Sequence, residues 1–500
     1  MGPNVPPPRT TFFVSPQGDD EAAGDEARPM RTVTRALSAP GATAVVLRPG
    51  RYVESPTIAH DVALTGEGGV VIEGTITIGA VVASFVRVDI DGGLVVGGAK
   101  NLSLSSLTVR SSSTSDAIAL ADSVASLTDV ELFCGPETCL QVGTSTLAAV
   151  GLVLSPGRGE HKRGLRAETS SVTLRGVRAH GARIAQLQAS ARAHLTVLDA
   201  TLPELVGNGI VANDSFLTGA RIRIEGRGNT GIILSASDAD LSGLEIGPLP
   251  NDAQGIGILG GKVRIADSHL VRAGVAAIVV NDHRERRADV VIERVVIEHG
   301  SATGIQHGQG ALLLRAVRLI GNPSATSDGE DAILCSGETA DLVVESAEID
   351  APAGFGIGVY RDAGARITGA VVTRPRLGGI IIDDSAGAAL SIVSSRVSDC
   401  KQGSGIAVRN ALEVTLEDVE VTRCPEAGLL VALGGDVVVG RSKFLMNRQY
   451  GVAAFGQSSL TVSGSTVRGS KWAAFASCAD GSSVVDGGNN TFEGATTLCP

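Results

Sequence analysis

A short phrase recurs along most of this chain. It consists of a small residue, an aliphatic anchor, any residue and a second aliphatic residue, as in "FGIGVYR", "GGIIIDD" and "SGIAVRN". Successive anchors lie 20 to 28 residues apart. Repeats of this length cannot bury their apolar faces alone, so they stack on one another in a solenoid. The anchors are Ile210, Ile232, Ile258, Ile278, Ile305, Ile333, Ile357, Ile380, Ile406, Leu429, Val452 and Phe475, with weaker copies at Leu165, Leu140 and Ile118.

A second phrase lies between the anchors and alternates apolar with polar residues. Examples are "DLVVESAEI" at 341–349 and "LEVTLEDVEV" at 412–421. This alternation predicts strands with one buried face, and no helical pattern separates them. Each repeat should therefore form one turn of the solenoid, with ~4.8 Å between stacked strands. The period of ~24 residues and its variable length favour a right-handed parallel β-helix over a left-handed hexapeptide helix or a propeller.

The repeat predicts a single all-β domain over residues 12–500, preceded by a Pro-rich tether at 1–11. Within this domain we expect an N-terminal cap and first strands at 12–55, coils at 56–485 and a C-terminal cap at 486–500. Caps are needed because the open end of a solenoid exposes strand edges. In "MRTVTRALSA" at 30–39, Val33, Ala36 and Leu37 have helical spacing, which predicts a short helix covering the N-terminal end.

The composition limits the possible partners. Hydrophobic residues make up 43% of the chain and aromatic residues only 3%, so the core must consist of Val, Ile, Leu and Ala. The net charge of −11 argues against a nucleic-acid partner. No apolar run approaches the ~20 residues of a membrane-spanning helix. The first residues show no apolar segment of a secretory leader.

The seven cysteines favour disulfides over a zinc site, because none forms a CxxC pair. Cys400 and Cys424 are 24 residues apart, about one coil, so stacking would bring them within the Cα range of a disulfide. Disulfides would indicate an extracellular or cell-surface location; the alternative is that all seven are reduced thiols. Cys134 and Cys139 flank a turn, Cys478 and Cys499 bracket the tail, and Cys335 is the seventh.

The segments "FFVSPQGDD", "PMRTVTRAL" and "VVLRPGRYVES" resemble the N-terminal signature of bacterial pectin-lyase-like β-helix proteins. This resemblance implies a right-handed parallel β-helix. The superfamily includes polysaccharide lyases, glycoside hydrolases, uronate epimerases and many secreted or surface proteins without known activity, so it indicates a fold and not a reaction. The matching residues are Phe13, Val14, Ser15, Pro16, Gly18, Asp19, Asp20, Gly24, Pro29, Arg31, Thr32, Val33, Ala36, Leu37, Arg48, Pro49, Gly50 and Tyr52.

Asp383 and Asp384 form the first candidate catalytic site. They follow Asp362 by one coil, and polygalacturonases similarly carry an N-T-D triplet one coil before a D-D pair. Two carboxylates roughly 6.5–9.5 Å apart could act as general acid and base in inverting glycoside hydrolysis. The His and Lys motifs that follow in that family are missing here, and Arg361 replaces the Thr. The alternative is that both aspartates are solvent-facing turn residues.

Tyr360, Arg361, Asp362 and His307 are the candidate ligand-binding residues. Arg361 and Asp384 each lie four positions past their anchors, so we expect them side by side on consecutive coils. That placement predicts an exposed Arg361–Asp384 ion pair, which would contribute at most ~1 kcal/mol.

Asp282, His283 and Arg284 form a second candidate catalytic cluster, one coil before His307. A polysaccharide lyase or epimerase needs a cation that neutralises the uronate carboxylate and a base that removes the C5 proton. A charged loop of this kind can equally be a solvated bulge.

Calcium is the possible cofactor, and no other is indicated. Asp328, Glu330 and Asp331 in "SDGEDA" offer oxygen ligands, without the full spacing of a calcium loop.

These features favour a rigid extracellular or cell-surface scaffold that binds a polysaccharide or other surface ligand on its lateral face. The alternative is a polysaccharide lyase or uronate epimerase acting on an acidic glycan, and a third hypothesis is a structural spacer. The scarcity of Trp and Tyr, common partners of sugar rings, argues against an enzyme. Charged side chains that converge in a concave groove would argue for one.

Overall fold

The computed structural model describes residues 10–111, 116–157, 161–250, 252–271, 274–300, 302–321, 329–385, 389–477 and 480–498. Most of the predicted tether at 1–11 therefore lies outside the described residues. By contacts, the chain divides into two compact units, Met1–Gly228 (unit 1) and Asn229–Pro500 (unit 2). Each unit is a parallel β-solenoid with two walls, here called sheet A and sheet B. The prediction of one domain over 12–500 stays a prediction.

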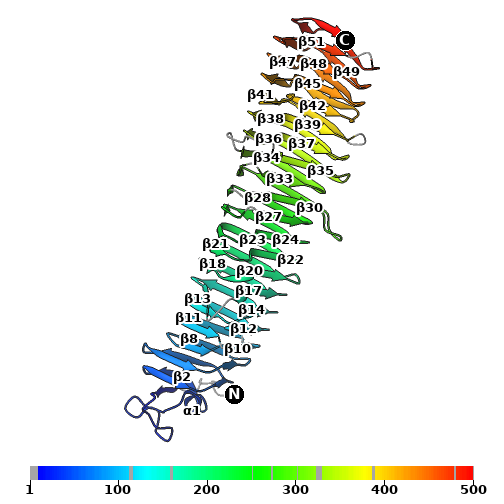
Figure 1. The fold of residues 1–500 in the computed structure, drawn as a ribbon. Helices are drawn as coiled ribbons and strands as arrows, with labels where there is room; N and C mark the ends of the chain where they lie inside the picture. Colours follow the sequence, from blue (N-terminus) through cyan, green and yellow to red (C-terminus); the bar gives the residue numbers. More distant parts are fainter. Residues whose placement is uncertain are drawn as a thin grey trace. The chain divides into compact units, whose positions relative to one another are not determined.

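Unit 1 stacks its strands in parallel, each coil on the next (Figure 1). Apolar residues alternate with polar ones along them, which is why one face of each strand is buried. Its sheet A strands are β1 (Thr10–Val14), β2 (Ala42–Leu47), β3 (Gly50–Val53), β5 (Val62–Gly66), β6 (Val70–Glu73), β8 (Val82–Val86), β9 (Asp89–Gly92), β11 (Asn101–Ser111), β13 (Val124–Cys134), β15 (Thr146–Val150), β16 (Val153–Pro156), β18 (Ser171–Arg175), β19 (Arg178–Ala179), β21 (His194–Leu205) and β23 (Phe216–Gly226). Its sheet B strands are β4 (Thr57–Ile58), β7 (Ile76–Ile78), β10 (Leu94–Gly97), β12 (Ile118–Ala121), β14 (Thr138–Gly143), β17 (His161–Glu168), β20 (Ala182–Ser190) and β22 (Asn208–Asn213).

A five-residue helix, α1 (Val33–Leu37), lies within the predicted 30–39 segment and contacts β1 and β2. The Thr32 hydroxyl accepts the Arg35 N–H at 3.2 Å, which is an N-cap bond. The three residues with helical spacing are buried, as predicted. The described residues otherwise form strands and turns, and they include no helix long and apolar enough to cross a membrane.

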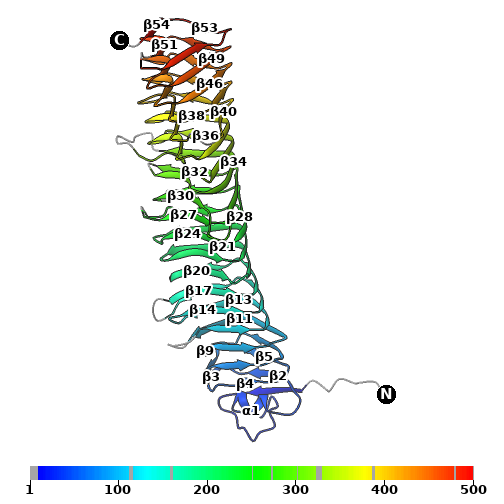
Figure 2. The same cartoon turned by 90° about the vertical axis from the view of Figure 1, so that its right-hand side faces the viewer.

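Unit 2 repeats the same arrangement, and Figure 2 shows its strands from the side. Its sheet A strands are β25 (Asp238–Ser242), β26 (Glu245–Ile246), β28 (Gly261–Ala266), β29 (His269–Val271), β31 (Ala288–Glu293), β32 (Val296–Gly300), β34 (Gly310–Gly321), β36 (Ala340–Asp350), β38 (Gly364–Thr373), β40 (Leu390–Val393), β41 (Arg396–Ser398), β43 (Val414–Glu417), β44 (Glu420–Thr422), β46 (Asp436–Gly440), β47 (Lys443–Leu445), β49 (Ser459–Ser463), β50 (Thr466–Arg468), β52 (Ser483–Asp486) and β53 (Thr491–Phe492). Its sheet B strands are β24 (Thr230–Ser235), β27 (Gln254–Leu259), β30 (Ala276–Asn281), β33 (Thr303–His307), β35 (Ile333–Ser336), β37 (Phe355–Tyr360), β39 (Gly378–Asp383), β42 (Ile406–Arg409), β45 (Ala427–Ala432), β48 (Tyr450–Ala454), β51 (Ala473–Ser477) and β54 (Thr496–Leu498).

The predicted anchors stack on one another in sheet B. Ile333, Ile357, Ile380 and Ile406 occupy matching positions on consecutive strands, and all are fully buried. The ladder continues through Leu429, Val452 and Phe475.

One anchor was misplaced by two residues. Ile256, not Ile258, pairs with Ile232 and Ile278, and Ile258 pairs instead with Leu234. Both Ile256 and Ile258 point inward, because residues two apart on a strand share a face.

The strands of the C-terminal stretch continue the ladder. β53 and β54 pair in parallel with β50 and β51, so the repeat extends to Leu498. Residues 486–498 thus form part of a further coil, where we had expected a cap folded over the last one.

Aspartates and arginines in the turns pair between consecutive coils. In each pair the aspartate belongs to the earlier coil, and the arginine of the next coil reaches back to it. At Asp399–Arg423 the guanidinium Nη2 lies 2.8 Å from the carboxylate Oδ2. Among the described residues with positive φ, such pairs are Asp199–Arg221, Asp267–Arg294, Asp399–Arg423 and Asp418–Arg441.

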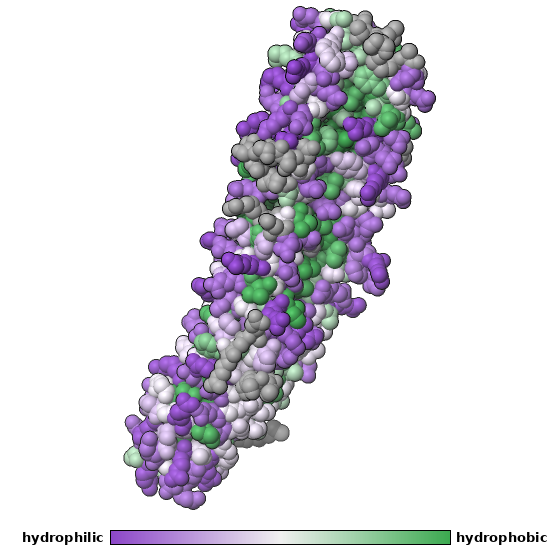
Figure 3. Space-filling view, in the orientation of Figure 1, coloured by the Kyte–Doolittle hydropathy of each residue, from purple (hydrophilic) through white to green (hydrophobic). Residues whose placement is uncertain are grey.

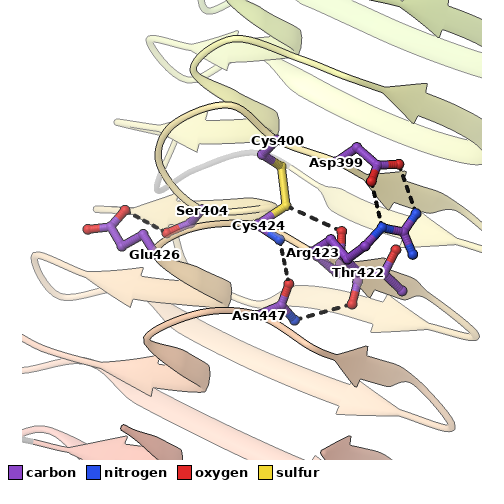
Figure 4. Close-up of a disulfide and its surroundings, with 9 residues drawn as sticks. Asp399, Cys400, Ser404, Thr422, Arg423, Cys424, Glu426 and Asn447 are labelled. Atoms are coloured by element: carbon purple, nitrogen blue, oxygen red, sulfur yellow. Dashed lines mark hydrogen bonds and ion pairs between the residues drawn. A yellow bond between two sulfur atoms is a disulfide. The ribbon is translucent and has the colours of Figure 1, made fainter. Parts of the chain in front are cut away.

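The described residues form two disulfides, Cys134–Cys139 and Cys400–Cys424. The second joins consecutive coils with a Cα–Cα distance of 4.6 Å, which confirms the predicted stacking (Figure 4). Beneath it, the buried Asn447 side chain accepts the Cys424 N–H at 3.0 Å and donates to the Val421 carbonyl at 3.2 Å. Cys335 is a buried free thiol, and Cys478 and Cys499 lie outside the described residues.

Replacing both Cys400 and Cys424 by Ala is expected to lower the free energy of unfolding by about 3 kcal/mol. The disulfide closes a 24-residue loop, and restricting that loop destabilises the unfolded chain by this order. Chemical denaturation of oxidised parent and variant measures the difference. A thiol count on unfolded, unreduced protein is the control: seven free thiols would show that neither disulfide forms.

Candidate functional site

A cavity of about 550 Å³ lies where the sheet B strands of four consecutive coils end in unit 2. The strands are β33, β35, β37 and β39. Because their anchors are in register, the residues just past each strand fall on one line. The cavity is lined by Gln306, His307, Gly308, Leu334, Ser336, Tyr360, Arg361, Asp383 and Asp384. It therefore contains five of the residues predicted from the sequence.

Tyr360 lies across the outside of its own strand. Its hydroxyl donates to Asp331 Oδ2 at 2.7 Å, and Asp331 Oδ1 accepts the Phe355 N–H at 2.8 Å. A Cβ on Gly358 would lie 2.4 Å from the Tyr360 ring, so the ring needs a glycine beneath it. Burial raises the pKa of the Asp331 carboxyl, and burial and the Asp331 charge together raise the pKa of Tyr360. These contacts fix the ring in place.

Arg361 and Asp384 lie on consecutive coils, as predicted, but they do not form the predicted ion pair. Among the described residues, Arg361 makes no ion pair. Asp384 Oδ1 instead accepts from the Asn410 side chain of the following coil at 2.8 Å. The reason is the direction of reach: donors in these turns reach back one coil, and the position behind Arg361 is Gly337. The Arg361 guanidinium therefore finds no carboxylate at the matching position of the preceding coil.

His307 does not face the solvent. Its ring is fully buried, with Nε2 donating to the Gly310 carbonyl at 3.2 Å and Nδ1 lying 3.5 Å from the Cys335 sulfur. Burial lowers the pKa of His307 to about 4 and raises the pKa of the Cys335 thiol to about 12. His307 therefore supports the floor of the cavity as a neutral ring, whereas we had expected it to contact a ligand.

A second cavity of about 520 Å³ adjoins the first across the turn at Arg361 and Asp362. Asp282 lines it and also accepts the Ala288 N–H at 2.6 Å, so this carboxylate holds a turn. The lining residues are Asp282, Arg287, Glu338, Thr339, Ala340, Asp341, Asp362, Gly364, Arg366 and Ala389. Of the predicted aspartates, Asp362 lies beside Asp384, with its backbone N–H donating to the Asp384 carbonyl at 2.7 Å, whereas Asp282 lines the second cavity.

His283 and Arg284 line neither cavity. The backbone N–H and carbonyl of His283 both pair with Arg286, which closes a small bulge. Arg286 in turn binds Asp238, two coils earlier. Asp282 therefore lines a cavity, whereas His283 and Arg284, which follow it in the chain, do not, and the proposed catalytic role of His283 and Arg284 stays a prediction.

The predicted calcium ligands do not form a cluster in the described residues, where no three metal-ligating side chains come together. Asp328 lies outside those residues, Glu330 is exposed, and both Asp331 oxygens already accept hydrogen bonds. The calcium site stays a prediction.

Sequence reasoning missed Gln306, Leu334 and Ser336. Gln306 and Leu334 lie one position past their anchors, and Ser336 lies three positions past its anchor, as Tyr360 and Asp383 do. Because odd offsets from an inward anchor point outward, reading the offsets alone could have found them.

Three comparisons relate this chain to known proteins. The model of the family described as "Right handed beta helix region" matches residues 331–497. No curated protein sequence matches the chain.

Several solved structures are similar at low identity. The catalytic domain of a GH87 α-1,3-glucanase in complex with tetrasaccharides is 12% identical, with 98% of this chain and 70% of that chain covered and a TM-score of 0.26. The periplasmic alginate epimerase AlgG is 10% identical, with 82% and 75% covered and a TM-score of 0.21. The thermostable GH87 α-1,3-glucanase from Streptomyces thermodiastaticus strain HF3-3 is 14% identical, with 96% and 68% covered and a TM-score of 0.17. These TM-scores are too low to assign a ligand or an activity. The family match and the parallel coils identify residues 331–497 as a right-handed β-helix region.

Proposed function

We propose that this protein is a rigid scaffold that binds an acidic polysaccharide in the cavity around Tyr360. The observation that carries the proposal is the Arg361 guanidinium, which lines a cavity beside two aspartates and a fixed tyrosine ring without an ion-pair partner among the described residues. A planar guanidinium is suited to a carboxylate, which it can bind through two parallel hydrogen bonds.

The other lining groups suit the rest of a sugar. Asp383 and Asp384 can accept hydrogen bonds from hydroxyls, and Gln306 and Ser336 can both donate and accept. Tyr360 offers an amphipathic ring that needs no ordering on binding, because Asp331 already holds its hydroxyl. An acidic sugar therefore matches this set of groups if its carboxylate binds Arg361 and its hydroxyls bind the aspartates.

The arrangement favours binding over bond cleavage. A lyase or epimerase needs a base near the uronate C5, and the histidine and the tyrosine of the cavity are both engaged. His307 is buried, and the Tyr360 hydroxyl donates to Asp331. The converging carboxylates still support the alternative of a uronate lyase or epimerase, with Asp383 or Asp384 as the base.

The proposal also includes three expectations from the sequence analysis. They are membership of the pectin-lyase-like superfamily, an extracellular or cell-surface location suggested by the two disulfides, and a role for α1 as a cover of the N-terminal end.

Arg361→Gln is expected to weaken binding of polygalacturonate roughly 10- to 100-fold, because charge-assisted hydrogen bonds contribute about 1.5–3 kcal/mol. Isothermal titration calorimetry measures the affinity. Lys100→Gln, which removes an exposed cation from unit 1, is the matched control and should bind like the parent.

Equal binding by parent and Arg361→Gln would refute the proposed site, as would equal affinity for a neutral glucan. Absorbance of unsaturated uronate products, followed with the same polymers, tests the alternative. If the parent forms such products and the Asp383→Asn/Asp384→Asn variant does not, the enzyme alternative replaces the proposed binding function.

A further inference from the structure

Three aromatic rings meet on unit 2, in a chain that is only 3% aromatic. Tyr450 contacts Phe455 at 5.8 Å and Trp472 at 5.6 Å between ring centroids, both edge to face. Trp472 is the chain's only tryptophan, and it is 55% exposed. A large apolar side chain this exposed, beside two other rings, marks a candidate contact surface.

These rings lie on the outer face of sheet B, over its small and aliphatic residues. Tyr450 and Phe455 pack on a cluster formed by Ala427, Leu430, Ala453 and Ala476. Figure 3 shows the hydrophobic residues gathered in the region where Figure 1 labels β45 and β48. This packing already holds Tyr450 and Phe455 in place, so a ligand does not need to order them.

Two cations lie beside the rings without described acidic partners. Arg448 and Lys471 are exposed and stack on consecutive coils, with the Lys471 N–H donating to the Arg448 carbonyl at 3.0 Å. Neither forms an ion pair within the described residues. A nearby carboxylate, that of Glu426, accepts the Ser404 hydroxyl at 2.8 Å on the preceding coil (Figure 4). Like charges stacked in this way repel, and an anionic ligand would relieve that repulsion.

We propose that Arg448, Lys471, Tyr450 and Trp472 form a second binding site for an acidic polysaccharide. This inference rests on the proposed function, because it assigns the same class of ligand. The cations would bind the carboxylates, and the rings would contact the apolar faces of the sugars. The net charge of −11 disfavours general attraction of polyanions, so binding here depends on these local groups.

The two sites can hold one polymer. Tyr360 lies on β37 and Tyr450 on β48, which are four steps apart through β39, β42 and β45. At ~4.8 Å per step, this is about 19 Å along the solenoid. A polymer that spans both sites binds the second one intramolecularly, so its affinity exceeds that of a short oligomer.

The single tryptophan reports the second site directly. Galacturonate oligomers from dimer upward, and polygalacturonate, are titrated against the parent, Arg361→Gln and Arg448→Gln/Lys471→Gln, with intrinsic fluorescence and calorimetry in parallel. Lys100→Gln/Lys443→Gln, which removes two exposed cations elsewhere, is the control. Poly-glutamate tests whether negative charge alone is sufficient.

We expect short oligomers to change Trp472 fluorescence equally in the parent and Arg361→Gln, and not in Arg448→Gln/Lys471→Gln. Arg361→Gln and Arg448→Gln/Lys471→Gln should each bind polygalacturonate at least 10-fold more weakly than the parent, and the control should bind like the parent. An unchanged polymer affinity in Arg448→Gln/Lys471→Gln, with loss only in Arg361→Gln, would overturn this inference and leave the proposed function standing. If polymer affinity is lost only in Arg448→Gln/Lys471→Gln, the cavity around Tyr360 is not a binding site, and the second site is retained. Equal binding of poly-glutamate, or no response to any sugar, would overturn the inference.

Discussion

Ile357→Asp is expected to destabilise unit 2 by at least about 4 kcal/mol. Deleting a fully buried aliphatic side chain costs roughly 2–5 kcal/mol, and the new carboxylate is buried without a partner. Ile357 is 0% exposed and stacks between Ile333 and Ile380, so the charge would lie within the ladder. The free energy of unfolding from denaturant titration measures the loss.

Two substitutions provide controls. Val371→Asp places the same charge on an outward position of β38, where the side chain is 37% exposed, and should cost less than about 1 kcal/mol. Ile357→Val keeps the position apolar and should cost about 0.5–1.5 kcal/mol. If Ile357→Asp unfolds no more easily than Val371→Asp, the anchors do not point inward.

Acidification is expected to destabilise both units, through His161 in unit 1 and His307 in unit 2. Burial lowers the pKa of each to about 4 in the folded state, with the His180 charge adding to the effect at His161. Well above pH 6.5 both rings are neutral in the folded and in the unfolded state. As the pH falls from 6.5 to 4, only the unfolded chain takes up the protons, so stability is lost across this window. The loss approaches about 3 kcal/mol per histidine.

His161→Leu isolates one of these contributions. The His161 ring is fully buried, and neither nitrogen has a hydrogen-bond partner among the described residues, so leucine removes the titration without breaking a bond. We expect the variant to be at least as stable as the parent at pH 7.5 and more stable at pH 4.5. Parallel curves of unfolding free energy against pH would contradict the assignment.

The sequence alone determined the architecture, because strand side chains alternate with a period of two and each coil stacks on the next. The anchors at Ile333, Ile357, Ile380 and Ile406 could be read in register for this reason. The same rule placed Cys400 over Cys424 and Arg361 beside Asp384. It also explains why the His307 ring is buried: His307 lies two positions past Ile305 within the same strand, where an even offset points inward.

Only the tertiary structure decided which neighbouring groups meet. The Tyr360–Asp331 bond joins residues on consecutive coils whose separation varies with loop length, and Tyr450 meets Trp472 in the same way. The Arg361–Asp384 pair failed because turn donors reach toward the preceding coil, and there Gly337 offers no carboxylate. A repeat fixes the position of each backbone segment, whereas loop length and side-chain direction decide the contacts. The cavity and its unpaired guanidinium therefore appear only in three dimensions.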